Sequence, residues 1–187
     1  MKQQPLERFV KGTMVLDIVK TIRGFHDKPW DQYLSREAQE LLQQRILASA
    51  WYPYEPVINC LNAIYLLIGG NNPKNARAWG RINGKQVFET VYKTLMVPGD
   101  TTESLKKLSI IVNVFFKGSS YESKEIEPRH FQVQIFDNDP RTEAIYYLVQ
   151  GWIDVIIEIT GGKNAKVLFA QKHWEGNEFT IIDIRWE

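Results

Sequence analysis

The sequence has a single cysteine among 187 residues, and this scarcity limits the chemistry open to it. One thiol, Cys60, forms no intramolecular disulfide, and a thiolate site for zinc or an iron–sulfur cluster needs several cysteines. We therefore expect a reducing compartment and predict a cytoplasmic location. Cys60 lies within an apolar segment of a predicted helix, where a cysteine is typically a small buried hydrophobic residue rather than an activated thiolate.

An excess of charge of either sign is also missing. The chain has 23 Lys and Arg residues against 22 Asp and Glu residues. Non-specific binding to nucleic acid or to a membrane surface relies on a strong positive field, so neither partner is expected. The longest apolar runs, such as 60–68 and 155–159, fall far short of the roughly 20 residues that cross a bilayer. The N-terminal run MKQQPLERFVKG lacks the apolar core of a signal peptide, so we expect neither secretion nor a membrane span.

The composition is that of an ordinary globular protein. Apolar residues make up 44% of the chain and charged residues 24%, which argues against disorder. A chain of this length is sufficient for one substantial core. We therefore predict a single domain over residues 1–187.

Apolar residues at three- and four-residue spacing predict most of the elements. The first three expected helices run from Phe9 to near Gly24, from Ser35 to residue 49, and from Pro56 to before Gly69. A fourth covers 85–96, with Asn72-Pro73 as a possible opening. The last two cover 101–116, behind the capping box at Asp100, and the stretch from Asp139-Pro140 to Gly161. The IIVNVFF run at 110–116 also has the character of a strand, although we favour helix.

Strands are predicted near the C-terminus. Residues 129–136 alternate between apolar and polar, and 165–186 have the pattern of a hairpin with a turn at 175–178. Helices come first, followed by strand, helix, strand and strand. This order predicts an α+β fold, in which a helical layer packs on a small antiparallel sheet with a C-terminal β-hairpin.

Several groups of residues are weak candidates for chemistry. The run from Gly80 to Lys85 has only three residues between its glycines and lacks the Ser or Thr of a phosphate loop, so we interpret it as a helix junction. The three histidines, His26, His130 and His173, show no metal-binding spacing. Asp154 and Glu158 share a helix face and have the spacing of an acid–base pair, but we expect that face to be solvated.

Aromatic side chains are the most distinctive feature, with six Trp, eight Tyr and nine Phe. Such rings fill cores, and they also line ligand pockets and interfaces. Core filling is the favoured interpretation, and a lined pocket or partner surface is the alternative. For a pocket, size and apolar context favour Tyr52, Tyr54, Cys60, Tyr65, Phe115, Phe116 and Trp152.

Four segments carry a resemblance that spans nearly the whole chain. They are VKGTMVLDIVKTI at 10–22, YPYEPVINCLNAIY at 52–65, GRINGKQVFETVYKTLM at 80–96 and WEGNEFTIIDIRW at 174–186. With them the chain resembles a myxobacterial-type family related to the ligand-binding superfamily of nitric-oxide signalling and Golgi transport. That superfamily includes haem nitric-oxide-binding domains, vinyl reductase domains and the Bet3-like subunits of the TRAPP tethering complex.

The resemblance implies helices packed against an antiparallel sheet, with a cavity that relatives use for haem, small molecules or an acyl chain. Haem-binding relatives hold the propionates with a Tyr-x-Ser-x-Arg motif. Here Tyr121 and Ser123 match, but Glu125 replaces the arginine, and a carboxylate repels a propionate. His26, the nearest upstream histidine, is not placed as an axial ligand, so we expect no haem and no other cofactor. An acyl site of the TRAPP kind would leave Cys60 as its candidate residue.

The sequence thus favours a non-catalytic regulatory or sensor domain that binds a small hydrophobic ligand in a pocket between helices and sheet. The alternative is a dimeric protein–protein interaction or scaffold module, as a homodimer or with another protein. No nucleophile, base and orienting group are required by the sequence to meet, so we do not expect an enzyme.

Overall fold

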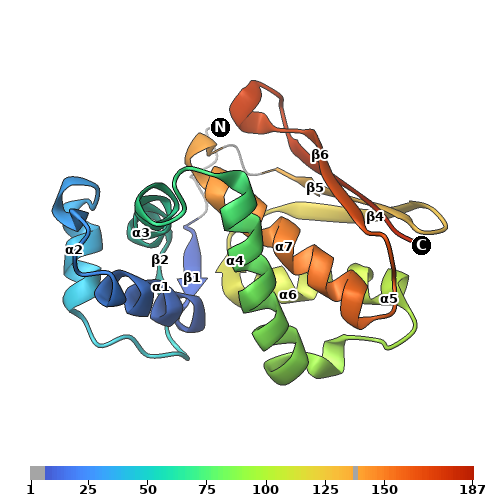
Figure 1. Cartoon of the computed structure of the whole chain (residues 1–187), viewed down its shortest axis with the longest axis horizontal. Coiled ribbons are helices and arrows are strands. Elements are labelled where there is room, and N and C mark those ends of the chain that lie inside the picture. The colour runs from blue at the N-terminus through green and yellow to red at the C-terminus, as the bar shows by residue number, and fades with distance from the viewer. Residues whose placement is uncertain (1–6, 137–138) are drawn as a thin grey trace. The chain divides into compact units, whose positions relative to one another are not determined.

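The computed structural model describes residues 7–136 and 139–187 (Figure 1). As predicted, the fold is α+β, with helices packed against antiparallel sheets and a C-terminal antiparallel strand pair. Two compact units make up the chain: Met1–Asn71 with Val112–Ser119, and Asn72–Ile111 with Ser120–Glu187. The single domain over 1–187 stays a prediction, and each unit is described by itself.

The first unit contains a small three-stranded antiparallel sheet and three helices. The strand order is β2-β1-β3, and Val10 in the central strand pairs with Tyr52 on one side and Phe116 on the other. The elements are β1 (Phe9–Lys11), α1 (Gly12–Gly24), the 3₁₀ turn η1 (Trp30–Gln32), α2 (Arg36–Gln43), β2 (Trp51–Pro53), α3 (Tyr54–Leu67) and β3 (Phe116–Lys117).

The first predicted helix begins too early in the sequence, because Phe9 and Val10 belong to β1. α1 starts only at Gly12, whose backbone N–H donates to the Ala50 carbonyl at 2.9 Å. A Cβ at Gly12 would lie 2.0 Å from the Leu47 oxygen, so this close approach requires glycine. A strand of three residues is too short to show an alternating pattern in the sequence, so Phe9 and Val10 were assigned to the helix that follows.

The second predicted helix is too long, because α2 ends at Gln43 rather than near 49. Its start is as expected, with the Ser35 hydroxyl accepting a hydrogen bond from the Ala38 N–H. The last turn of α2 and the backbone beyond it form hydrogen bonds with side chains of other elements. The Arg23 guanidinium donates to the Leu42 carbonyl, and the Leu47 N–H donates to the Tyr52 hydroxyl. The third helix is confirmed: Pro56 lies in the first turn of α3, which ends at Leu67 before Gly70 with φ +61°.

The second unit contains a four-stranded antiparallel sheet of order β4-β5-β7-β6. Its regular elements are α4 (Pro73–Gln86), the π-helical turn η2 (Val87–Val91), the 3₁₀ turn η3 (Lys93–Leu95), α5 (Thr101–Lys106), β4 (Tyr121–Glu127), β5 (His130–Ile135), the 3₁₀ turn η4 (Pro140–Thr142), α7 (Glu143–Ile159), β6 (Lys166–Gln171), the 3₁₀ turn η5 (His173–Glu175) and β7 (Thr180–Arg185). The unit boundary runs through α6 (Leu108–Phe115). The helical interpretation of the IIVNVFF run is confirmed up to Phe115, but the single helix expected over 101–116 is wrong, because it is interrupted at Lys107 and Phe116 belongs to β3.

Helices α4 and α7 lie side by side and approach closely through glycines (Figure 1). A Cβ at Gly80 would lie 2.1 Å from the Leu148 carbonyl oxygen, and one at Gly151 would lie 2.2 Å from the Arg77 oxygen. The interpretation of 80–85 as a helix junction is therefore wrong, since these residues lie inside α4. Regular helix ends at Gln86, so the helix expected over 85–96 is replaced by a π-helical turn and a 3₁₀ turn.

The C-terminal half of the second unit follows the predicted order. The Asp139 carboxylate caps η4 by accepting from the Arg141 N–H, and α7 continues to Ile159. The predicted hairpin is formed by β6 and β7, with the chain reversing through Gly176 at φ +96°. Strand β4 was not predicted, because its exposed sequence YESKEIE has no apolar alternation and it pairs with β5 through its backbone. Among the described residues, no helix has the length and apolar character needed to span a membrane.

Candidate functional sites

The seven predicted pocket residues are all buried, but they do not belong to one unit. Trp152 lies in α7 of the second unit. The other six lie in the first unit: Tyr52 in β2, Tyr54, Cys60 and Tyr65 in α3, Phe115 in α6 and Phe116 in β3. Their role as ligand contacts stays a prediction.

Several of these aromatic rings make contacts typical of packed cores. The Arg8 guanidinium lies 3.5 Å from the centre of the Tyr54 ring. The Trp152 indole N–H donates to the Asn83 side-chain oxygen at 3.2 Å, and its ring meets Phe88 edge-to-face at 5.9 Å. These contacts satisfy both the faces and the polar ends of the rings.

The Cys60 side chain is in an environment that suppresses its chemistry. It is fully buried in α3, and burial raises the pKa of the thiol to about 12. A thiol with that pKa is almost entirely protonated at neutral pH, whereas nucleophilic attack and metal binding need the thiolate. The geometry therefore supports the sequence-based interpretation of a small buried hydrophobe.

A surface hollow of about 450 Å³ opens in the first unit among the end of α1, η1 and α2. The buried side chains Ile22, Trp30 and Leu34 form an apolar floor, and Leu42 adds apolar surface. The rim is polar and is lined by Arg23, His26, Asp31, Gln39 and Gln43. An apolar floor with a few polar groups around it is the usual arrangement of a small-ligand site.

None of the seven predicted residues lines this hollow. Its lining comes from segments that are brought together by the short loop at 25–29 and by the Trp30 indole, which donates to the Phe25 carbonyl at 2.7 Å. Sequence periodicity identified the stripes of α1 and α2 but not the angle between the two helices. The sequence feature that could have indicated this hollow is a tryptophan directly after a proline, between two amphipathic helices.

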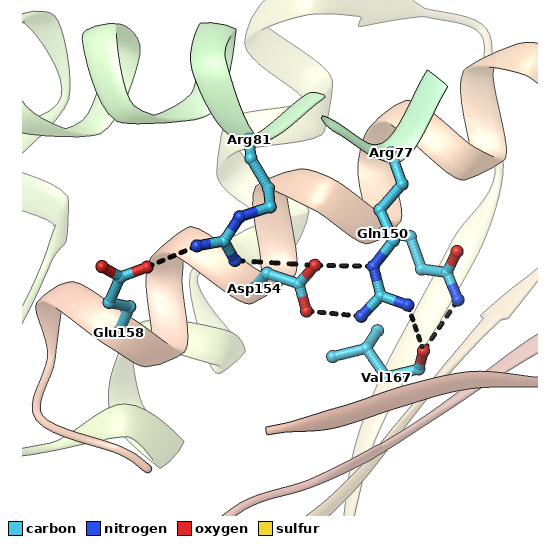
Figure 2. Close-up of polar contacts among 6 residues, drawn as sticks. All are labelled: Arg77, Arg81, Gln150, Asp154, Glu158 and Val167. Carbon is cyan, nitrogen blue, oxygen red and sulfur yellow. Dashed lines mark hydrogen bonds and ion pairs between the residues drawn. The ribbon is translucent and has the colours of Figure 1, made fainter. Parts of the chain in front are cut away.

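A buried ion pair joins the elements of the second unit (Figure 2). The Arg77 guanidinium on α4 binds the Asp154 carboxylate on α7 through two hydrogen bonds of 2.7 Å. The same guanidinium donates to the Val167 carbonyl of β6 at 3.3 Å, and the Gln150 amide donates to that oxygen at 2.7 Å. Asp154 is only 5% exposed, so this pair links two helices and a strand inside the unit.

The expectation that Asp154 and Glu158 lie on a solvated face is wrong for Asp154 and right for Glu158. α4 covers the face that carries Asp154, whereas the Glu158 side chain is 60% exposed and pairs with Arg81 at 2.7 Å. Periodicity within α7 could not reveal a second helix on its polar side. The long stripe in fact extends around the helix, with every residue from 144 to 157 buried.

A second hollow, of about 570 Å³, opens beside this ion pair. α4 contributes Arg77 and Arg81, and the end of α7 contributes Asp154, Ile157 and Glu158. The turn before β6 completes the lining with Gly162, Lys163, Asn164 and Ala165. Charged side chains dominate this hollow, in contrast to the one in the first unit.

The two buried histidines have both ring nitrogens engaged. His130 lies between the carboxylates of Glu127 and Asp183, at 3.2 and 2.6 Å. Burial acts to raise the pKa of Asp183, but hydrogen bonds from Gln132, His130 and Arg185 together lower it. His173 pairs with the Thr180 hydroxyl at 2.8 Å and with the Asp139 carbonyl at 2.7 Å.

Comparison with solved structures identifies the fold. The chain is similar to the Fe(II) unliganded H-NOX protein of K. algicida, with 9% identity and a TM-score of 0.63, covering 95% of this chain and 96% of that one. It is also similar to the S. oneidensis H-NOX protein in the Fe(II)NO ligation state (10% identity, TM-score 0.62, 95% and 99% coverage) and to a mutant of T. tengcongensis H-NOX (15% identity, TM-score 0.58, 95% and 97% coverage). No family model matches the sequence, and no curated protein matches it.

These similarities show an H-NOX-like architecture, which is the fold that the resemblance implied. The myxobacterial-type family and the links to vinyl reductase and TRAPP domains stay predictions. At these identities the comparison establishes the architecture, and ligand binding has to be judged from the residues of this chain.

The histidines present do not fit the role of axial haem ligand. Haem iron needs an axial ligand, but both buried histidines use both ring nitrogens and His26 is exposed. Glu125, which stands where haem-binding relatives have an arginine, lies 3.6 Å from the Lys106 ammonium. Tyr121 donates its hydroxyl to the Ser109 carbonyl. Among the described residues, no group of three or more His, Cys, Asp or Glu side chains is arranged to hold a metal ion.

Proposed function

We propose that this chain is a non-catalytic sensor or regulatory domain that binds a small ligand with an apolar body. The observation that carries the proposal is the nearly end-to-end structural match, which covers 95% of this chain and between 94% and 99% of each compared H-NOX chain. The match therefore extends over the whole sensor module. We place its action in the cytoplasm, in keeping with the single buried cysteine.

The proposed ligand is a small organic molecule without iron, and so is not haem. The two buried histidines are held by neighbouring side chains and backbone, so iron would have to displace existing hydrogen bonds. The hollow in the first unit suits a different molecule, because Ile22 and Leu34 supply an apolar floor and Arg23 and His26 supply polar groups at the rim. A small amphipathic molecule matches that distribution.

The described residues offer little to an enzymatic mechanism. The Cys60 thiol stays protonated, and His130 and His173 are committed to structural hydrogen bonds. The buried Asp154 is neutralised by Arg77. Catalysis by a side chain needs a nucleophile or base that can reach a substrate, and each of these groups is instead protonated or engaged by a neighbouring residue.

Native mass spectrometry of the protein purified from its own host tests the proposal. We expect a native mass above that of the denatured chain, and we expect Leu42→Gln to lose the additional mass because Leu42 lines the hollow. Leu66→Gln is the matched control, since Leu66 is 43% exposed on α3 of the same unit. A wild-type protein with no retained mass, or equal loss in both variants, contradicts the proposal.

Added haem provides a second measurement on the same protein. After added haem is separated from the protein by gel filtration, we expect the protein fraction to show no Soret band that responds to nitric oxide. A stoichiometric complex with a nitric-oxide-sensitive band would contradict the exclusion of haem. Because the readout is optical, it is independent of the mass measurement.

A homodimeric or scaffold function is the alternative. Its support is Ile82, a large apolar side chain on α4 that is 72% exposed and that a partner protein could cover. Light scattering over a concentration series decides between the two functions. A dimer that dissociates in Ile82→Lys and carries no ligand would favour the scaffold.

A further inference from the structure

The charged hollow of the second unit carries an inference that is independent of the proposed sensor function. Its lining residues all belong to one unit, and none of them lines the hollow of the first unit. Three basic residues, Arg77, Arg81 and Lys163, and two acidic residues, Asp154 and Glu158, line it. These lining residues carry one net positive charge around a hollow of about 570 Å³.

The deepest charges of this hollow neutralise each other. Both carboxylate oxygens of Asp154 accept from Arg77 at 2.7 Å, so this buried pair presents no net charge to a ligand. Asp154 also lies 3.8 Å from the nearer nitrogen of Arg81, which draws that guanidinium toward the hollow. The remaining charges among the lining residues are those of Arg81, Lys163 and Glu158. The Glu187 carboxylate lies beside the lining residue Asn164, whose amide donates to it at 2.7 Å.

The Arg81–Glu158 pair is at the rim and is readily exchanged. Its side chains are 45% and 60% exposed, and an ion pair with that exposure stabilises a protein by only about 0 to 1 kcal/mol. The Glu158 carboxylate occupies the position on the guanidinium that any oxyanion would take, because carboxylate and phosphate oxygens match the same fork of N–H donors.

The turn that carries Lys163 is held firmly. Its backbone exchanges two hydrogen bonds with Glu187, of 2.8 and 2.7 Å, and the neighbouring Asn164 amide donates to the Glu187 carboxylate at 2.7 Å. The backbone of Lys163 is therefore held at the edge of the hollow, which the residues of α4 also line. A dianion between Arg81 and Lys163 would meet two cations, whereas Glu158 offers Arg81 a single negative charge.

We propose that this hollow is a binding site for a phosphate group, held between Arg81 and Lys163, and that Glu158 occupies the guanidinium in its absence. Glu158 thus competes with the ligand. Arg77 and Asp154 position Arg81 without contacting the phosphate. The shared chemistry is the phosphate dianion, which free inorganic phosphate and phosphate monoesters both carry.

Isothermal titration calorimetry of the full chain with inorganic phosphate at low ionic strength tests the site. We expect Glu158→Gln to bind phosphate roughly three- to fivefold more tightly, since it removes a competing exposed pair. We expect Arg81→Gln and Lys163→Gln each to weaken binding more than about tenfold, the usual loss for a charge-assisted hydrogen bond. These side chains lie at the rim, so thermal unfolding should confirm that each variant is folded.

Matched controls come from the neighbouring pair on the same helical stretch. Lys85 and Glu89 lie 4.0 Å apart, and neither lines the hollow. Lys85→Gln and Glu89→Gln change the same net charges and should leave the phosphate affinity unchanged. If they shift it as much as the hollow variants do, the effect is the general field of the protein and the proposed site is wrong. Absence of any phosphate binding to Glu158→Gln also overturns it.

Glycerol phosphate and acetate serve as the second arm of the experiment. A monoester that binds as well as inorganic phosphate, or better, supports the site and shows that the hollow admits the attached group. Acetate, with one charge, should bind more weakly than either. Acetate that binds as tightly as phosphate would contradict recognition of a dianion. Because the hollow of the first unit is untouched, failure here leaves the sensor proposal standing, and the reverse also holds.

Discussion

The two units of this chain are stabilised by different kinds of contact. In the second unit, a buried ion pair joins α4, α7 and β6. Glycines on α4 and α7 let these two helices approach so closely that a Cβ would clash with the backbone of the other helix. In the first unit, cations lie on the faces of aromatic rings at the outer surface, as Lys11 and Lys117 do on Trp51. These charged contacts are therefore buried on the Asp154 side in the second unit and exposed in the first, while both units use glycine where backbones approach closely, at Gly12 and at Gly80.

This difference also determines what each unit offers a ligand. The hollow of the first unit has the apolar floor and polar rim of a site for an amphipathic molecule, whereas the hollow of the second unit is lined mainly by charged groups. The paired side chains of Arg77 and Asp154 form part of the lining of the second hollow. The two hollows should accordingly respond to different classes of molecule.

The largest expected effect comes from removing one partner of the buried pair. Arg77→Met removes both short hydrogen bonds from the buried Asp154 carboxylate and leaves Arg81, at 3.8 Å, as its remaining partner. Loss of one partner of a buried ion pair costs about 3 to 5 kcal/mol, and we expect the lower end of that range because Arg77 is 31% exposed. We expect urea denaturation to show a decrease of this size in the free energy of unfolding. The double variant Arg77→Met with Asp154→Leu should recover most of the loss, because it leaves no unpaired charge.

An exposed pair in the first unit is the control for this prediction. Arg36 and Glu40 lie 2.9 Å apart on α2, with Arg36 87% exposed. Arg36→Met should change the free energy of unfolding by about 0.5 kcal/mol or less. Equal losses in Arg36→Met and Arg77→Met would remove the distinction between the two units.

Asp154 also illustrates what the sequence could and could not predict. Its helix, its cap at Asp139 and the apolar stripe were evident from spacing, because these features depend on neighbours within a few residues. Its burial depends on α4, which lies far away in the sequence, so a carboxylate on the polar side of α7 looked solvated. The same reasoning explains the hollow near Trp30, whose lining converges only in three dimensions.

The next effect in size concerns the helix contact itself. Gly80→Ala places a methyl group where the Leu148 carbonyl oxygen lies 2.1 Å away, and backbone cannot move aside as a flexible side chain can. We expect a loss of about 3 kcal/mol, at the upper end for overpacking, measured by urea denaturation. Gly24→Ala in α1 is the control, since a Cβ there meets no atom within 4 Å. A neutral Gly80→Ala would mean that α4 and α7 are not in close contact.

Short strands and glycine contacts were the main errors of the sequence-based interpretation. Phe9 and Val10 were assigned to a helix, and the glycines of α4 to a junction, because periodicity weighs apolar side chains and gives no weight to a residue that has none. Capped starts were predicted correctly, as at Asp100 before α5, although the helix expected there over 101–116 is divided into α5 and α6. Local chemistry thus fixes where elements begin, while the packing between them is set by contacts distant in the sequence.

The smallest expected effect tests the first unit. The Lys117 ammonium lies 4.4 Å from the centre of the Trp51 ring, and Lys11 lies 4.7 Å from it. An exposed cation–π contact contributes about 0.5 to 1 kcal/mol, so Lys117→Met should lower the free energy of unfolding by about that amount or less. Lys20→Met, which removes an exposed lysine from α1 of the same unit, controls for the change in net charge. A Lys117→Met loss as large as that of Arg77→Met would show that the surface cations of the first unit are as indispensable as the buried pair of the second.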